Sequence, residues 1–259
     1  MNKNNKKIPA IILLGGKGSR FSSYRDLPKQ LMKLGKDNIL IEILKNFKKN
    51  GINYFILPLG YKNKHFLKFF SSKKNLFKYN INIVKNPRLE KINESKINIK
   101  LFNAGNTSSK LERIYKSLAY FKEDNFIVTY GDGIANINLK KLVNIYFKEK
   151  NKVLLTSFRA FSQYGHVISD KKNNVINFIE KPQMKYPINV GFYIISKKIF
   201  LSNFKKNYEL ENDFIPILVK KRILKNFNHV GYFYSVDDKK DLVKAREKLR
   251  NKLWKKKIF

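Results

Sequence analysis

The stretch that decides the fold lies near the N-terminus, where residues 8–20 read IPAIILLGGKGSR. The apolar run at residues 8–14 is continuous, as is typical of a central parallel strand that is covered on both faces. A glycine-rich loop follows at once, and glycines at the end of a strand let backbone N–H groups close around an anion. Open α/β sheets bind ligands at this edge. The stretch therefore predicts the first strand of a mostly parallel sheet, with an anion site at its end.

Outward from this strand, the chain alternates between strand-like and helix-like segments, which favours a sheet covered by helices. We expect strands at residues 53–57, 81–84, 97–102, 126–130, 153–158, 175–179, 191–195 and 227–236, and helices at residues 39–47, 62–70, 111–121, 139–147, 211–222 and 238–252. The predicted fold class is α/β, with a Rossmann-like mixed, mostly parallel sheet. We find no clear linker, so the 259 residues are predicted to form a single domain.

Composition excludes several classes of protein. The chain has no cysteine, which excludes disulfides, thiolate metal sites and cysteine nucleophiles. No window reaches the roughly 18 uncharged apolar residues that a membrane span needs, so we expect no membrane partner and a cytoplasmic location. The net charge of +36 would suit a nucleic-acid binder, but 47 of the 55 basic residues are lysine and they are scattered along the chain. Nucleic-acid readers rely on arginine, so we expect no nucleic-acid partner.

The glycine-rich loop is neither of two familiar phosphate-binding loops. A P-loop requires Ser or Thr directly after its Gly-Lys pair, and here Gly18 follows Lys17. A dinucleotide fingerprint requires glycine where Phe21 stands. Taken alone, the loop is as consistent with a simple chain reversal as with anion binding.

The residues after the loop change that balance. Arg20 follows the glycines, and Leu27-Pro28-Lys29-Gln30 comes shortly afterwards. A strand, Gly-Gly-x-Gly-x-Arg and then Pro-Lys resembles the signature of the sugar-1-phosphate nucleotidylyltransferases. The resemblance implies that the loop wraps a nucleoside triphosphate, that Arg20 holds the departing pyrophosphate and that Lys29 contacts phosphate. Backbone donors and cations are the groups expected around such an anion.

The resemblance continues in order along nearly the whole chain, and it is strongest to the glucose-1-phosphate cytidylyltransferase branch. Matching segments are Gly51-Ile52-Asn53, Gly60-Tyr61-Lys62, Thr129-Tyr130-Gly131-Asp132-Gly133, Tyr164-Gly165, Glu180-Lys181-Pro182, Asn189-Val190-Gly191-Phe192, the segment 211–216 and the segment 231–238. It implies transfer of a nucleotidyl group from an NTP, by this branch CTP, to a sugar 1-phosphate, by this branch glucose 1-phosphate, in nucleotide-sugar biosynthesis. It also implies a nucleotide-binding half at about residues 8–135, a sugar-phosphate-binding half at about residues 136–259, and a homo-oligomer.

Functional residues follow from the same resemblance. The implied catalytic residues are Arg20, Lys29, Asp132 and Lys181. The implied nucleotide-binding residues are Leu14, Gly15, Gly16, Gly18, Ser19, Arg20, Lys29, Gly105, Thr107, Gly131 and Asp132. The implied sugar-phosphate-binding residues are Gly165, Glu180, Lys181, Asn189, Gly191 and Glu211. Asp132 and Asp237 are the implied ligands of a Mg²⁺ cofactor.

Each acidic residue also has an ordinary structural interpretation. Asp132 lies between two glycines, where aspartate often forms turns, and Asp237 precedes the last expected helix and would suit its N-cap. The chain departs from the family at Leu14, Ser19, Val190, Asp238 and the loop 104–110. The changes at Val190 and in that loop concern the base and the sugar more than the reaction.

Three other functions remain open at this point. The first is the same reaction with UTP, dTTP or GTP, or with another sugar. The second is a basic nucleic-acid-binding protein, which predicts salt-sensitive binding to DNA and leaves the ordered motifs unexplained. The third is a non-catalytic nucleotide sensor, against which the retained Arg20, Lys29, Asp132, Lys181 and Asp237 argue.

Overall fold

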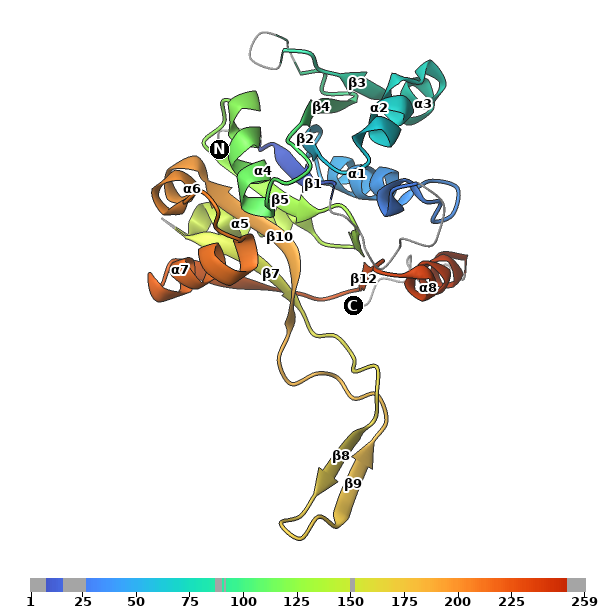
Figure 1. Ribbon diagram of the computed structural model, residues 1–259, viewed down its shortest axis with the longest axis vertical. Helices are drawn as coiled ribbons and strands as arrows, with labels where there is room; N and C mark the ends of the chain where they lie inside the picture. The colour runs from blue at the N-terminus through green and yellow to red at the C-terminus, as the bar shows by residue number, and fades with distance from the viewer. Residues whose placement is uncertain (1–7, 16–26, 87–89, 91, 150–151, 251–259) are drawn as a thin grey trace.

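A computed structural model describes residues 8–15, 27–86, 90, 92–149 and 152–250. Among these residues, eight strands form one central sheet in the order β11-β7-β10-β5-β1-β2-β4-β3 (Figure 1). The strands are β1 (Ala10–Leu13), β2 (Tyr54–Leu59), β3 (Ile81–Ile83), β4 (Ile97–Asn103), β5 (Asn125–Tyr130), β7 (Val153–Phe158), β10 (Ile188–Ser196) and β11 (Leu224–His229). Neighbouring strands are parallel except where β10 pairs with β5 and β7. The mixed, mostly parallel sheet predicted from the sequence is confirmed.

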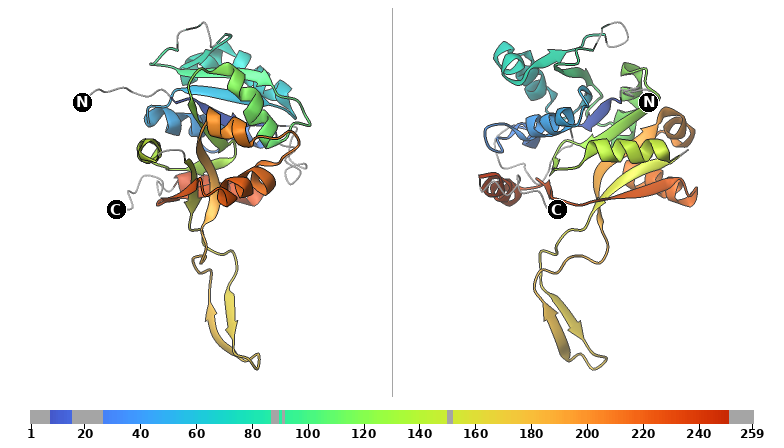
Figure 2. Two further views of the ribbon diagram at one scale, coloured as in Figure 1. Left: turned by 90° about the vertical axis from the view of Figure 1, so that its left-hand side faces the viewer. Right: turned by 180° about the vertical axis from the view of Figure 1, so that it is seen from behind.

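Helices cover both faces of the sheet (Figure 2). They are α1 (Ile39–Lys49), α2 (Asn63–Ser71), α3 (Lys73–Tyr79), α4 (Lys110–Ser117), α5 (Leu139–Lys148), α6 (Lys197–Asn203), α7 (Ile215–Lys220) and α8 (Lys239–Arg250), with short 3₁₀ turns η2 (Lys29–Leu31) and η3 (Leu118–Tyr120) and a π turn η4 (Leu210–Phe214). Strand β1 supplies both cores, because Ala10 and Ile12 join one apolar cluster and Ile11 and Leu13 the other. Alternate residues of a strand point to opposite faces, so the continuous apolar run at residues 8–14 is explained.

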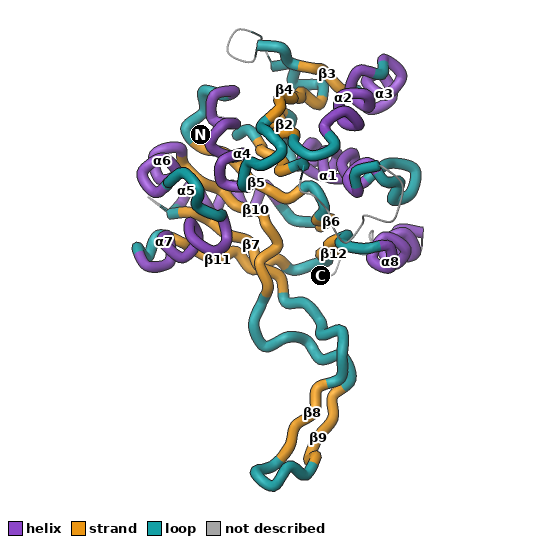
Figure 3. The backbone as a smooth tube through the Cα atoms, viewed as in Figure 1, coloured by secondary structure: helices purple, strands orange, loops and turns teal. Residues whose placement is uncertain are grey.

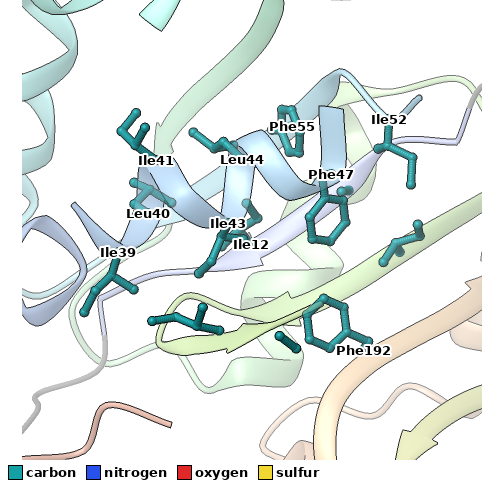
Figure 4. Close-up of a cluster of buried hydrophobic side chains, with 14 of the residues drawn as sticks. Ile12, Ile39, Leu40, Ile41, Ile43, Leu44, Phe47, Ile52, Phe55 and Phe192 are labelled. Carbon is teal, nitrogen blue, oxygen red and sulfur yellow. The ribbon is translucent and has the colours of Figure 1, made fainter. Parts of the chain in front are cut away.

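Helix α1 shows how local sequence and packing agree. The side chain of Asn38 accepts a hydrogen bond from the Ile41 N–H (2.9 Å), which caps the helix start. The apolar residues at helical spacing are buried against the sheet (Figure 4). Phe47 packs edge-on to Phe55 and stacks on Phe192 of β10, with ring centroids 5.8 and 5.9 Å apart. This contact joins the two halves of the chain in one core.

One predicted strand is wrong. Residues 227–236 were expected to form a single strand, but the chain leaves the central sheet after His229. A second strand, β12 (Phe233–Ser235), then pairs antiparallel with β6 (Gly133–Ala135), outside the central sheet. Tyr232 lies in the segment between β11 and β12, and its N–H donates a hydrogen bond to the side chain of Asn136, which directly follows β6 (2.8 Å). The strand partner therefore changes partway along residues 227–236, at the segment that contains Gly231.

A long two-stranded arm projects from the body (Figures 1 and 3). It consists of β8 (His166–Ser169), β9 (Val175–Ile179) and the segments that join them to β7 and β10. Its apolar side chains are exposed, among them Val175, Ile176 and Phe178 at 63%, 65% and 60%. The sequence predicted β9 as a strand, but nothing in its pattern placed it outside the sheet. In the described part of the chain, we find no helix long and apolar enough to cross a membrane.

Candidate active site

Asp132 and Asp237 are brought together by the small β6–β12 sheet. Gly133 pairs with Ser235, and the Val236 N–H donates a hydrogen bond to the backbone carbonyl of Asp132 (3.1 Å). The two carboxylates therefore lie at one end of a strand pair, although the residues are far apart in the sequence. This end follows β5, whose C-terminal end lies beside that of β1. The acidic pair thus lies at the edge of the sheet where the sequence predicts ligand binding.

Lys29 lies between the two carboxylates. Its Nζ is 2.7 Å from Asp132 Oδ2 and 3.1 Å from Asp237 Oδ1, and its side chain is 14% exposed. Burial lowers the pKa of Lys29, but attraction and hydrogen bonds to Asp132 and Asp237 outweigh burial and leave the pKa raised. The Ser235 hydroxyl donates to Asp237 Oδ2 (2.7 Å). One ammonium group thus contacts both acids.

The interpretation of Asp237 as the N-cap of the last helix is wrong by one residue. Asp238, one residue later, accepts the hydrogen bond from the Asp241 N–H (2.8 Å) at the start of α8. The Asp241 carboxylate in turn accepts from the N–H groups of Asp237 and Asp238 (3.1 and 3.3 Å). Since its neighbour caps the helix, the Asp237 side chain is directed to Lys29 and Ser235 instead.

Arg113 is a buried residue that the sequence analysis did not single out. It is 5% exposed, and its guanidinium donates to the backbone carbonyls of Leu14 (2.5 Å), Gly15 (3.3 Å) and Gly105 (3.1 Å). Its Nε also donates to the Ser108 carbonyl (3.0 Å). Burial lowers the pKa of Arg113, although an arginine remains charged. Arg113 thus fastens the end of β1 to the 104–108 loop, the two segments predicted to contact the nucleotide.

A second group of polar residues lies where β5, β10 and η4 meet. The Tyr130 hydroxyl donates to Glu211 Oε1 (2.5 Å) and shares a hydrogen bond with the Tyr193 hydroxyl (3.1 Å). Asn189 donates to Tyr193, and Lys110 Nζ is 2.6 Å from Glu211 Oε1. Burial raises the pKa of Tyr193 to about 12, so its hydroxyl stays protonated. Asn189 and Glu211, both predicted to bind the sugar phosphate, belong to one hydrogen-bonded network.

Gly191 explains why this network can form. Its φ is +77°, and a Cβ there would lie 2.1 Å from the Tyr130 ring. A side chain at this position would push Tyr130 away from Glu211. The neighbouring departure from the family, Val190, is 1% exposed and packs in the core. Leu14 is likewise 1% exposed, so both larger side chains point away from the polar network.

The remaining predicted residues are not brought together with these groups. Gly165, Glu180 and Lys181 lie on the arm. Lys181 Nζ is 3.1 Å from Glu180 Oε1, and the two side chains are 62% and 60% exposed. Thr107 is exposed on the loop after β4. Gly16, Gly18, Ser19 and Arg20 lie outside the described residues, so their roles stay predictions.

The acidic pair has the chemistry of a magnesium site. Mg²⁺ prefers oxygen ligands, and proteins often supply only one or two carboxylates while substrate phosphates complete the shell. Asp132 and Asp237 offer such oxygens, and the contact of both with the Lys29 ammonium shows that the place between them accepts a cation. Among the described residues, no group of three or more His, Cys, Asp or Glu side chains is placed to hold a metal ion. The donor set therefore fits an ion that also depends on a bound phosphate.

Comparison with known proteins decides the family, because the sequence model of the nucleotidyl transferase family matches residues 9–250 of this chain. The chain belongs to the nucleotidyl transferase family. A probable glucose-1-phosphate cytidylyltransferase of Bacillus subtilis (strain 168) is 30% identical to it, over 95% of this chain and 96% of that protein. This nucleotidyl transferase is thus a sugar-1-phosphate nucleotidylyltransferase near the cytidylyltransferases, as its sequence motifs indicated.

Other relatives of this nucleotidyl transferase differ in the base they are named for. The D-glycero-alpha-D-manno-heptose 1-phosphate guanylyltransferase of Aneurinibacillus thermoaerophilus is 26% identical over 94% of this chain and 99% of that protein. The crystal structure of HddC from Yersinia pseudotuberculosis aligns with a TM-score of 0.66 at 24% identity and covers 93% of this chain and 99% of its own. That structural likeness confirms the fold class.

Proposed function

We propose that this nucleotidyl transferase joins the cytidylyl group of CTP to glucose 1-phosphate, giving CDP-glucose and pyrophosphate. The observation that carries the proposal is the contact of Lys29 with Asp132 and Asp237 at the edge of the sheet, in a chain of this family. The choice of CTP rests on the segment Thr129-Tyr130-Gly131-Asp132-Gly133 and on the names of the Bacillus subtilis and Salmonella typhimurium relatives. The runner-up is the same transfer with GTP and a heptose phosphate, which the Aneurinibacillus relative suggests.

The proposed chemistry is an in-line displacement. A phosphate oxygen of the sugar phosphate attacks the α-phosphorus, a new P–O bond forms, and the bond to the β-phosphate breaks to release pyrophosphate. The attacking oxygen is already anionic, so no general base is required. The protein therefore acts by alignment and by neutralising charge. Lys29 and Arg20 are proposed to contact the triphosphate, and Lys181 the sugar phosphate.

Asp132 and Asp237 are proposed to hold the Mg²⁺ cofactor. When bound, the ion would neutralise phosphate charge and fix the geometry of the triphosphate. The chain's own contribution is the placement of the two acids, which depends on the β6–β12 pairing and on the Asp132 carbonyl that accepts from Val236. Asn189 and Glu211 are proposed to bind sugar hydroxyls, supported by their network with Tyr130 and Tyr193.

A pyrophosphate-release screen tests the proposal. CTP, UTP, dTTP and GTP are each combined with glucose 1-phosphate and a panel of other sugar 1-phosphates, with and without Mg²⁺. We expect release to be fastest with CTP and glucose 1-phosphate and to be lost without the metal. Faster release with GTP and a heptose phosphate would favour the runner-up. No release with any pair would contradict the function itself.

We further propose a cytoplasmic homo-oligomer. The exposed apolar side chains of the arm support self-association, because patches of this kind mark interaction sites. Light scattering would measure the mass in solution. Replacing Val175, Ile176 and Phe178 by threonine should reduce that mass, whereas a monomeric wild-type protein would contradict the proposal.

A further inference from the structure

Lys29 has been assigned to the triphosphate, yet its ammonium group contacts the two acids proposed to hold the metal. The same oxygens, Asp132 Oδ2 and Asp237 Oδ1, would be the ligands of a divalent ion. An ammonium at 2.7 and 3.1 Å from these oxygens and a divalent ion at bonding distance from them would repel each other strongly. Lys29 and the metal therefore compete for one place.

We propose that Lys29 acts as an exchangeable internal counter-cation, so that metal binding at Asp132 and Asp237 releases its ammonium group toward the triphosphate. This inference rests on the proposed function for the identity of the metal site and of the anion.

The position of Lys29 in the fold suits such an exchange. Lys29 is the first residue of η2 and directly follows Pro28. Element η2 is a short turn, so Lys29 does not lie in the middle of a long helix. The β6–β12 sheet fixes the backbone at Asp132 and Asp237, and Ser235 donates to the Asp237 carboxylate, so the two residues stay side by side when Lys29 leaves. The flexible four-carbon side chain of lysine can move its charge without a backbone change.

Two consequences follow for binding. Without nucleotide, the metal must displace Lys29, so its affinity is reduced. With nucleotide, the released ammonium gains the triphosphate as a partner, so metal and nucleotide favour each other's binding. Such a coupling is reciprocal and typically amounts to a factor of 5–150.

The test is a Mn²⁺ titration without nucleotide or sugar phosphate, followed by the electron paramagnetic resonance signal of free Mn²⁺. Lys29→Gln should bind Mn²⁺ at least about fivefold more tightly than the wild type, and Lys29→Arg, which keeps the charge, should not. The matched control is Lys45→Gln, which removes the same charge from the ion pair with Asp37. In the double variant Lys29→Gln/Asp132→Asn, the gain in Mn²⁺ affinity should disappear. Equal or weaker binding by a folded Lys29→Gln would overturn the proposal.

A second measurement needs only the wild-type protein, should Lys29→Gln fail to fold. Acylation of lysines by an amine-reactive reagent is followed by mass spectrometry, with and without Mn²⁺. We expect Lys29 to react faster with Mn²⁺ and Lys45 to be unaffected; an unchanged rate at Lys29 would overturn the proposal. Because neither experiment contains substrate, a failed pyrophosphate screen leaves both results interpretable. An active enzyme without these effects would refute the exchange alone.

Discussion

At the scale of single residues, the site depends on side chains whose neighbours come from distant parts of the chain. The sequence holds 47 lysines, and composition does not distinguish any of them. The Pro-Lys motif indicated Lys29 as a phosphate ligand, and the structure adds its contacts with Asp132 and Asp237. A lysine with two acidic partners has a defined position before any substrate arrives.

Replacing either acid should remove activity and leave the fold intact. Asp132→Asn and Asp237→Asn each delete a proposed metal ligand, so we expect kcat/KM for pyrophosphate release to fall by at least about a hundredfold. The exposed Asp124 provides a control with the same change of charge, and Asp124→Asn should retain activity. Circular dichroism and thermal unfolding report the fold. Full activity in Asp132→Asn would remove this residue from the metal site.

Gly191→Ala should disturb the hydrogen-bonded network of Asn189, Tyr193 and Glu211 through Tyr130. The new Cβ would lie 2.1 Å from the Tyr130 ring, at a φ of +77°. Gly51 has a similar φ of +86° but nothing within 4 Å of its Cβ position, so Gly51→Ala measures backbone strain alone. We expect Gly51→Ala to lose about 1 kcal/mol of unfolding free energy. Gly191→Ala should lose more than Gly51→Ala and should raise the KM for the sugar phosphate. Equal kinetics in the two variants would show that Tyr130 can move without consequence.

At the scale of elements, the sequence predicted most strands and helices but not every partner. The apolar pattern of residues 8–14 and 39–47 is decided locally, and both elements form as expected. Residues 227–236 were expected to form one strand, yet Gly231 lies between two strands, and the second of them pairs with β6, far earlier in the sequence. Local propensity cannot encode such a change of partner. The same holds for Arg113, since a buried arginine on a helix has no sequence signal of its own.

Arg113 should be important for stability because it joins two elements. Arg113→Ala would leave the carbonyls of Leu14, Gly105 and Ser108 without a charged donor, which we expect to cost about 3 kcal/mol or more. The exposed Arg246 donates to one carbonyl, that of Lys33 (2.9 Å), and Arg246→Ala should cost less than about 1 kcal/mol. Urea unfolding of both variants measures the difference. Similar losses in the two would mean that water replaces the Arg113 contacts.

At the scale of the whole molecule, the two-stranded arm lies outside the folded body. It is inserted between β7 and β10, which are antiparallel neighbours with Phe158 opposite Ile188. The exposed side chains of β8 and β9 show that the arm contributes little to the cores. Glu180 and Lys181, predicted to bind the sugar phosphate, nevertheless lie on it. Their sequence motif predicts binding of the sugar phosphate, but it gave no indication that they lie on a projecting arm.

Replacing residues 160–186 by a short Gly-Ser turn should therefore leave the body folded, because β7 and β10 can close as a hairpin. We expect a thermal midpoint within a few degrees of the wild type and loss of turnover with any sugar 1-phosphate. As a control, a turn replacement confined to residues 170–174 keeps both arm strands and should retain activity. Collapse of the body on removal of the arm would show that the arm supports the cores after all.

The pairing of β12 with β6 also has a consequence for synthesis on the ribosome. A growing chain that has reached β11 already contains Lys29 and Asp132 but not yet Asp237. Until the segment that carries Asp237 emerges, Lys29 can contact only one of its two acidic partners, Asp132. On the proposed metal role of Asp237, we therefore expect the growing polypeptide to have no activity before Asp237 has been translated.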